Sequence, residues 1–200
     1  MQTQSRLYTP EDYLAQEETA EFRSEYHDGA IVPMTGGSIN HNRIVRNLLA
    51  YLTIARKGRG FEPFGSDLRL WIPQHRRFTY PDGMVILGQP ELYGDRTDTV
   101  LNPSLIVEVL SRCMQSYDQS EKFRCYRSIP TLQEYVLINQ YVPAVDQYTR
   151  TEDGLWLLRA HDTVEGAIAF RSIDAELAIA DLYDGVEFEP EADGTTLLNT

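Results

Sequence analysis

Residues 103–110, PSLIVEVL, form a nearly continuous apolar run that carries a single acid, Glu108. Such a run is typical of a central strand buried on both faces, whereas a strand with one solvated face would alternate. A helical segment follows at about 116–129 and ends before Pro130, and a second strand-like segment, EYVLIN, follows at 134–139. Strand, helix and strand in this order predict a βαβ crossover within a mixed sheet.

One long helix is expected before this unit. Ile44, Val45, Leu48, Leu52 and Ala55 recur at helical spacing after Gly36-Gly37-Ser38, and Gly58 and Gly60 stop the pattern. At the N-terminus, Thr9-Pro10-Glu11-Asp12 has the cap, the proline and the acids of a helix start, so a short helix is expected to about Gln16.

Further strands are expected around this core. They fall at about 61–72, 78–87, 143–150 and 155–160, with two short strands in 24–34 about the turn Asp28-Gly29. Leu177, Ile179, Leu182 and Tyr183 predict a short helix or turn packed on the sheet, and beyond Glu187 the chain is expected to be frayed and acidic. The predicted fold is α/β (α+β): a mixed β-sheet flanked by helices, with an N-terminal helix and β-hairpin and a C-terminal antiparallel extension.

A chain of 200 residues fits one domain, 1–200, with a motif-bearing core at about 7–150 and an acidic extension at about 151–200. Cys113 and Cys125 have no Cys or His partner at zinc spacing, so free thiols in a reducing cytoplasm are expected. The sequence has no apolar signal-peptide core at its start and no run approaching the roughly eighteen apolar residues of a membrane span. We therefore expect a cytoplasmic protein without a membrane partner.

The net charge of −12 is unevenly distributed. Residues 1–30 hold seven acids and two bases, and residues 151–200 hold twelve acids and two bases. Residues 31–150 hold eleven acids and fourteen bases, so an anionic partner should meet the middle of the chain. The overall acidity argues against a protein that coats nucleic acid through bulk electrostatics. Only Lys57 and Lys122 are lysines, which is either drift or the mark of a site that needs a compact ammonium.

Two carboxylates lie on the predicted strands. Asp82 follows Tyr80-Pro81 and precedes Gly83 at a strand bend, where Pro-Asp-Gly is also an ordinary turn sequence. Glu108 shares a strand face with Ile106 and Leu110, and a carboxylate buried there is costly unless it is paired or bound to a metal. An ion pair with an arginine would be the purely structural explanation for Glu108.

Lys122 can be placed by helical geometry. At about 100° per residue, four residues fall within about 60° of Lys122: Asp118, Cys125, Tyr126 and Ile129. Lys122 is therefore predicted to lie near the centre of the face that packs on the core. A local ion pair with Asp118, one turn earlier, is the structural alternative.

His41 lies in the first turn of the long helix, on the side of Ile44, Val45 and Leu48, where a satisfied core histidine is the alternative to a functional one. Glu25 fits a solvated strand residue equally well.

Two strand carboxylates with one lysine are a recurrent unit for phosphodiester cleavage. The carboxylates hold Mg²⁺, which prefers oxygen ligands and keeps several waters, and the metal polarises the phosphoryl oxygen and lowers the pKa of a bound water. The lysine steadies the attacking water or the pentavalent charge, and a lysine among apolar neighbours can instead have a lowered pKa and act as a base.

Several short motifs resemble the Uma-two family of restriction endonucleases, within the PD-(D/E)XK nuclease superfamily. They are Pro81-Asp82, Glu108-Val109-Leu110-Ser111, Tyr117-Asp118 with Glu121-Lys122 and Tyr126, and Glu134-Tyr135-Val136, supported by the segment from Tyr8 to Leu14, Glu25 with Asp28-Gly29, and His41. The resemblance covers about 7–150 and rests on their order and spacing. It implies a restriction-endonuclease-like core, Asp82 and Glu108 as metal ligands, Lys122 as the catalytic lysine, and Glu25 and His41 as edge members of the site.

One position departs from the superfamily pattern. The residue two after Glu108, where the superfamily lysine would stand, is Leu110, so in this family the lysine is expected on the next helix, at Lys122. The helical geometry supports that shift independently.

The leading hypothesis is a Mg²⁺-dependent endonuclease acting on DNA, with Mn²⁺ as a substitute metal. Two alternatives stay open: a nuclease-fold domain that binds a partner or nucleic acid without turnover, and a metal-dependent hydrolase of a smaller phosphoester. A homodimer is expected only by analogy with double-strand cutters. Phe61, Phe64, Trp71 and Trp156 fit either a core or an interface.

Overall fold

The computed structural model describes residues 7–110 and 117–188, and its largest sheet has six strands in the order β11-β10-β9-β8-β6-β3. Their bounds are β3 Phe61–Gly65, β6 Gly83–Leu87, β8 Leu105–Leu110, β9 Glu134–Asn139, β10 Val145–Arg150 and β11 Trp156–His161. β8 and β9 pair in parallel, and the other neighbours in this sheet pair antiparallel. The sheet is therefore mixed, as expected.

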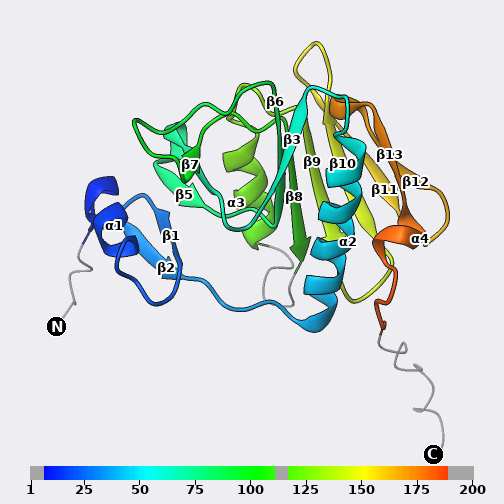
Figure 1. Ribbon diagram of the computed structural model, residues 1–200, viewed down its shortest axis with the longest axis horizontal. Coiled ribbons are helices and arrows are strands. Elements are labelled where there is room, and N and C mark those ends of the chain that lie inside the picture. Colours follow the sequence, from blue (N-terminus) through cyan, green and yellow to red (C-terminus); the bar gives the residue numbers. More distant parts are fainter. Residues whose placement is uncertain (1–6, 111–116, 189–200) are drawn as a thin grey trace, which may run out of the picture.

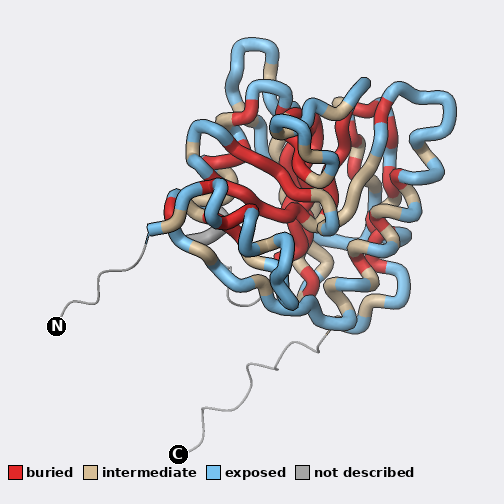
Figure 2. The backbone as a smooth tube through the Cα atoms, turned by 60° about the vertical axis from the view of Figure 1, so that its left-hand side comes forward, coloured by how far each residue is buried: buried red, intermediate tan, exposed pale blue. Residues whose placement is uncertain are grey.

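The predicted βαβ crossover is present. All six residues of β8 are buried, and helix α3, Tyr117–Tyr126, connects β8 to its parallel neighbour β9. Figure 2 shows the buried residues gathered along the central strands of the molecule. The nearly continuous apolar run therefore predicted correctly that this strand is covered on both faces.

Different helices cover the two faces of this sheet (Figure 1). Helix α2, Ile39–Ala55, packs Ile44, Leu48 and Leu52 against one face, together with strands β12, Ala167–Phe170, and β13, Ala175–Ala178, and helix α4, Ile179–Leu182. Helix α3 contributes buried residues to a second cluster, which includes Ile106 and Leu110. Because Glu108 shares a face with these two residues, its side chain lies on the α3 side of the sheet.

A second sheet has five strands in the order β2-β1-β5-β4-β7. Its bounds are β1 Ser24–His27, β2 Ala30–Pro33, β4 Arg69–Ile72, β5 Arg77–Thr79 and β7 Thr99–Val100, with the short 3₁₀ helix η1, Pro73–His75, before β5. Helix α1, Pro10–Glu17, packs its buried Tyr13 and Leu14 in a cluster with Phe78 of this sheet. Its start has the expected Thr9 cap, and Asp12 completes a capping box in which both hydrogen bonds are 3.0 Å long.

Two of the expected strands are wrong as single elements. The segment 61–72 divides into β3 of the larger sheet and β4 of the smaller one, and 78–87 divides in the same way into β5 and β6. At the second division the chain passes from one sheet to the other through Tyr80-Pro81-Asp82. Proline lacks the N–H that a central ladder needs, so the ladder breaks there and Asp82 lies between the two sheets.

The C-terminal part contains a hairpin that periodicity did not reveal. β12 and β13 pair antiparallel, and a second 3₁₀ helix, η3, Arg171–Ile173, joins them. The four apolar residues expected to pack on the sheet, Leu177 to Tyr183, do belong to its core. The chain from residue 189 onward, expected to fray, lies outside the described residues, as does Cys113.

The large aromatic residues belong to the core. Phe61 and Trp71 are buried, and Phe64 and Trp156 pack against the cluster under α3. In the described part of the chain, no helix is long and apolar enough to cross a membrane.

Candidate functional site

Glu108 and Lys122 form the centre of the site. Lys122 Nζ lies 3.1 Å from both carboxylate oxygens of Glu108, and Tyr126 donates its hydroxyl to Oε1 at 2.6 Å. The side chains of Lys122 and Glu108 are only 14% and 6% exposed, whereas Lys57 lies on the surface. One carboxylate therefore receives two donors that lie one helical turn apart on α3. The partner of Glu108 is a lysine rather than the arginine of the structural alternative.

Asp82, which directly precedes β6, lies against the strand that carries Glu108. Its Oδ2 accepts a hydrogen bond of 2.8 Å from the backbone N–H of Val109, the residue after Glu108. Its Oδ1 lies 3.1 Å from Nε2 of His41. The turn sequence is thus present, and its carboxylate is also directed at the strand that carries Glu108.

His41 is positioned by the start of α2. The Ser38 hydroxyl caps this helix by accepting the His41 N–H at 3.1 Å. Gly37 leaves room for the imidazole, because a Cβ at that position would lie 2.5 Å from His41 Nδ1. That Nδ1 is buried and has no hydrogen-bond partner among the described residues. His41 is therefore held toward Asp82 rather than satisfied within the core.

Glu25 approaches the site from β1. Its carboxylate accepts a hydrogen bond from the Thr79 hydroxyl and lies 2.7 Å from His27 Nε2. It is buried rather than solvated, and its charge acts on Lys122, Glu108 and Tyr126. All five residues that the sequence singled out thus form one electrostatic cluster.

Burial and the neighbouring carboxylates set the charges of the central pair. Burial alone would lower the pKa of Lys122, but Glu108, Glu25 and Asp82 together raise it above its ordinary value. The idea of a lysine with a lowered pKa acting as base is therefore wrong for this state, since Lys122 is an ammonium. Burial raises the pKa of Glu108, Lys122 opposes the rise, and Asp82 adds to it.

The outer members of the cluster are also shifted. Burial would raise the pKa of Glu25, but its contact with His27, the charge of Lys122 and the Thr79 hydroxyl lower it to about 2. The contact with Asp82 raises the pKa of His41 against the effect of burial. Burial and the nearby Glu108 raise the pKa of Tyr126 well above its ordinary value, so its hydroxyl remains a donor.

The donor chemistry fits a hard divalent cation. Within residues 7–110 and 117–188, no three His, Cys, Asp or Glu side chains form a group that could hold a metal ion by themselves. Mg²⁺ is commonly bound through one or two carboxylates, with waters and substrate phosphates completing its shell. Asp82 and Glu108 are therefore the two carboxylates that would hold such a cation when it binds together with a substrate.

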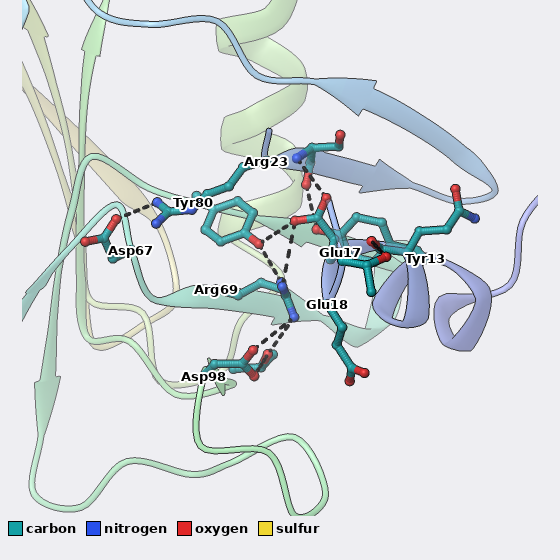
Figure 3. A network of polar contacts seen from close by, with 12 residues as sticks. Tyr13, Glu17, Glu18, Arg23, Asp67, Arg69, Tyr80 and Asp98 are labelled. Carbon is teal, nitrogen blue, oxygen red and sulfur yellow. Dashed lines mark hydrogen bonds and ion pairs between the residues drawn. The ribbon is translucent and has the colours of Figure 1, made fainter. Parts of the chain in front are cut away.

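A second polar network supports the chain just before Asp82 (Figure 3). Buried Arg69 donates to the Tyr80 hydroxyl at 2.8 Å, and this hydroxyl donates to Glu17 at 3.1 Å. The adjoining cavity, of about 290 Å³, is lined by more acids than bases: Glu17, Glu21, Asp67 and Asp98 against Arg23 and Arg69. This network holds Tyr80 and so the loop to Asp82, and its acidity excludes it as an anion site.

Sequence reasoning missed several members of the site. Tyr126 was placed on the inward face of its helix without a role, although its position one turn after Lys122 could have indicated a shared partner. Thr79 and Arg77 carry no local signal, because the pairing of β1 with β5 brings Thr79 to Glu25 and Arg77 to His27. His27 lies two residues after Glu25 on β1, so its position on the same strand face could have indicated their contact. The Asp118 side chain, the proposed local partner of Lys122, lies outside the described residues.

Comparison with known proteins finds one matching family and two similar proteins. Residues 10–180 match the model of the Uma2 (Uma-two) family, described as "Putative restriction endonuclease". Two proteins from Synechocystis sp. are similar: "Uncharacterized protein sll1609", 43% identical over 77% of this chain and 87% of its own length, and "Uncharacterized protein slr1290", 34% identical over 90% and 93%.

A solved structure has the same fold. It is described as a "putative nuclease belonging to DUF820" from Anabaena variabilis, with a TM-score of 0.70, 22% identity, and coverage of 88% of this chain and 98% of that one. On the family match and the identity of its relatives, the chain belongs to the Uma-two family.

Proposed function

We propose that this protein is a Mg²⁺-dependent endonuclease that hydrolyses phosphodiester bonds of DNA, with Mn²⁺ as a substitute metal. One observation carries the proposal: Lys122 pairs with Glu108 on β8, and Asp82 accepts the backbone N–H of the next residue, Val109, so that its charge acts on both members of the pair. The family match and the nuclease fold of the solved neighbour support the same class of function.

Each residue has a role that its contacts support. Asp82 and Glu108 would hold the cation, which when bound would polarise the phosphoryl oxygen and lower the pKa of a water. Lys122 is kept as an ammonium and would stabilise the negative charge that develops on the phosphoryl group. To do so it must exchange its contact with Glu108 for one with the substrate.

The neighbouring residues orient these groups. Tyr126 holds one Glu108 oxygen, and the Val109 N–H and His41 each hold one oxygen of Asp82. Glu25 adds negative charge beside Lys122, which keeps the ammonium protonated. We assign Tyr126, His41 and Glu25 as positioning residues.

The direct test is cleavage of plasmid DNA with Mg²⁺ or Mn²⁺. We expect activity that is lost in Asp82→Ala and is absent in EDTA. Glu134→Gln is the matched control, because Glu134 is also a buried strand carboxylate but bonds to Gln147 and to backbone N–H groups of residues 171 and 172. No cleavage of DNA or RNA by the wild type, or equal cleavage by Asp82→Ala, would contradict the proposal.

A second candidate function is binding of nucleic acid without turnover. The closed Glu108–Lys122 pair favours it, because Lys122 occupies both oxygens that a metal would use. Calorimetry separates the two functions: Mn²⁺ binding that is lost in Glu108→Ala supports the enzyme, and no Mn²⁺ binding to the wild type supports the non-catalytic domain.

A further inference from the structure

A cavity of about 320 Å³ lies beside the site, between the β1–β2 turn, η1 with the start of β5, and α3. Its size is at the lower end of the roughly 300–1,000 Å³ of ligand clefts. Its lining residues are His27, Asp28, Gln74, His75, Arg76, Arg77, Glu121, Arg124 and Cys125. Three arginines and two histidines thus face two carboxylates, the reverse of the balance in the acidic cavity beside Arg69.

Arg77 is the buried base of this cavity. Its side chain is 9% exposed, and its Nε has no hydrogen-bond partner among the described residues. The other nitrogens contact weak or neutral acceptors: NH2 lies 2.9 Å from His27 Nδ1, and NH1 lies 3.4 Å from Cys125 Sγ. The nearest carboxylate oxygen, on Glu121, is 4.0 Å away. A buried guanidinium in this state lacks an anionic acceptor.

The two acids of the lining do not supply it. Asp28 is engaged by Arg76 at 2.9 Å, on the exposed rim. Glu121 is more than a third exposed and stands at the limit of ion-pair distance from Arg77. Arg124, exposed on α3, makes no ion pair with a described residue. An anion in the cavity would therefore lie among lining residues that include the buried Arg77 and the exposed Arg124.

The cavity is connected to the candidate active site. Arg77 contacts His27, and His27 contacts Glu25, whose charge acts on Lys122. The same helix, α3, presents Lys122 to Glu108 and Arg124 to the cavity. The cavity and the candidate site are therefore linked by the Arg77–His27–Glu25 contacts and by their shared helix, α3.

We propose that this cavity binds a backbone phosphate of the polynucleotide, next to the phosphodiester that the Asp82–Glu108–Lys122 site would cut. The inference rests on the proposed function and names a substrate contact for it. Phosphate oxygens would supply the anionic acceptor that the Arg77 guanidinium lacks, and Arg124 supplies a second cation in the lining of the same cavity. Such a contact is independent of base sequence.

The test is the affinity of a fluorescent duplex, measured by anisotropy over a range of salt concentrations with Ca²⁺ in place of Mg²⁺. Arg124→Ala should weaken binding roughly 5–10-fold at 0.1 M salt and reduce the slope of log K against log salt by about 0.9, the value of one phosphate contact. Arg124→Lys keeps the charge and should keep most of the affinity. Arg127→Ala is the matched control, since it removes the same charge from an exposed position outside the cavity lining.

The outcomes separate this inference from the proposed function. DNA that is cut by the wild type, but bound with equal affinity and salt slope by Arg124→Ala and Arg127→Ala, would overturn the phosphate cavity and leave the nuclease intact. An Arg124-specific loss of binding without any cleavage would support the cavity and refute the enzyme. If inorganic phosphate alone saturates Arg77 and Arg124 at micromolar concentration and the duplex does not compete, the ligand is free phosphate and the backbone assignment is wrong.

Discussion

Glu25 shows how the surroundings of one residue set its charge. Its contacts with His27 and Thr79 and the charge of Lys122 lower its pKa from 4.5 to about 2 despite burial. Because the folded-state pKa is depressed, the resulting stability is present above about pH 4.5 and is lost as the pH falls toward 2. The shift corresponds to about 3 kcal/mol.

Glu25→Gln should therefore lower the free energy of unfolding near pH 6, and the difference from wild type should shrink as the pH falls from about 4.5 to about 2. Urea unfolding at a series of pH values measures it. Glu165→Gln, at an exposed acid, is the control and should follow the wild-type curve. The account of Glu25 fails if both variants keep the wild-type acid dependence.

Gly37 offers a second test at a single residue. A Cβ there would lie 2.5 Å from His41 Nδ1, so Gly37→Ala should displace the imidazole from Asp82. Since the contact with Asp82 is the main cause of the raised pKa of His41, that pKa should fall. NMR titration of the His41 ring protons measures it. Gly36→Ala is the control, because a Cβ at Gly36 meets nothing within 4 Å, and equal His41 pKa values in the two variants would refute the contact.

At the scale of elements, Glu134 joins β9 to the C-terminal hairpin. It accepts hydrogen bonds from Gln147 on β10 and from the backbone N–H groups of Arg171 and Ser172 in η3. Two of its donors are thus backbone N–H groups, whereas Glu108 is held by the side chains of a lysine and a tyrosine. Glu134 therefore has a structural role, whereas a chemical role for Glu108 is part of the proposed function.

Glu134→Ala leaves those two half-buried N–H groups without an acceptor and should lower the free energy of unfolding by about 2 kcal/mol. Hydrogen exchange of the Arg171 and Ser172 amides should accelerate more than that of β8. Glu134→Gln retains one acceptor oxygen and should lose less stability. Wild-type exchange at both amides in Glu134→Ala would contradict this role.

For the whole molecule, the distribution of charge matters more than the total of −12. The two ends of the chain are acidic, and the middle, which contains Asp82, Glu108 and Lys122, is slightly basic. Asp82, Glu108 and Glu25 nevertheless concentrate negative charge where a phosphate would have to approach. A bound divalent cation would offset that charge.

DNA affinity should accordingly be modest and should depend on divalent metal, falling about tenfold or more in EDTA. Anisotropy in Ca²⁺ and in EDTA, at one fixed ionic strength, measures the difference. Equally tight binding under the two conditions would show that the carboxylate cluster does not face the DNA.

Local sequence patterns alone determined several elements of the fold and the inward face of α3. The apolar run around Glu108 predicted a strand buried on both faces, because only such a strand has no polar side. Helical spacing predicted the inward face of α3, so Lys122 and Glu108 could be brought together without a structure. The capped start of α1 and the turn at Asp28-Gly29 were also readable, since caps and turns depend on adjacent residues.

Only the tertiary structure decided the rest. It divided 61–72 and 78–87 between two sheets, brought His41 to Asp82 and Glu25 to the vicinity of Lys122, and raised the pKa of Lys122 where burial alone would lower it. It also placed Arg77 beneath a cavity that no motif marks. The physical reason is common to all of these: each depends on pairing between strands and helices far apart in the chain, and local periodicity carries no information about which distant charges will become neighbours.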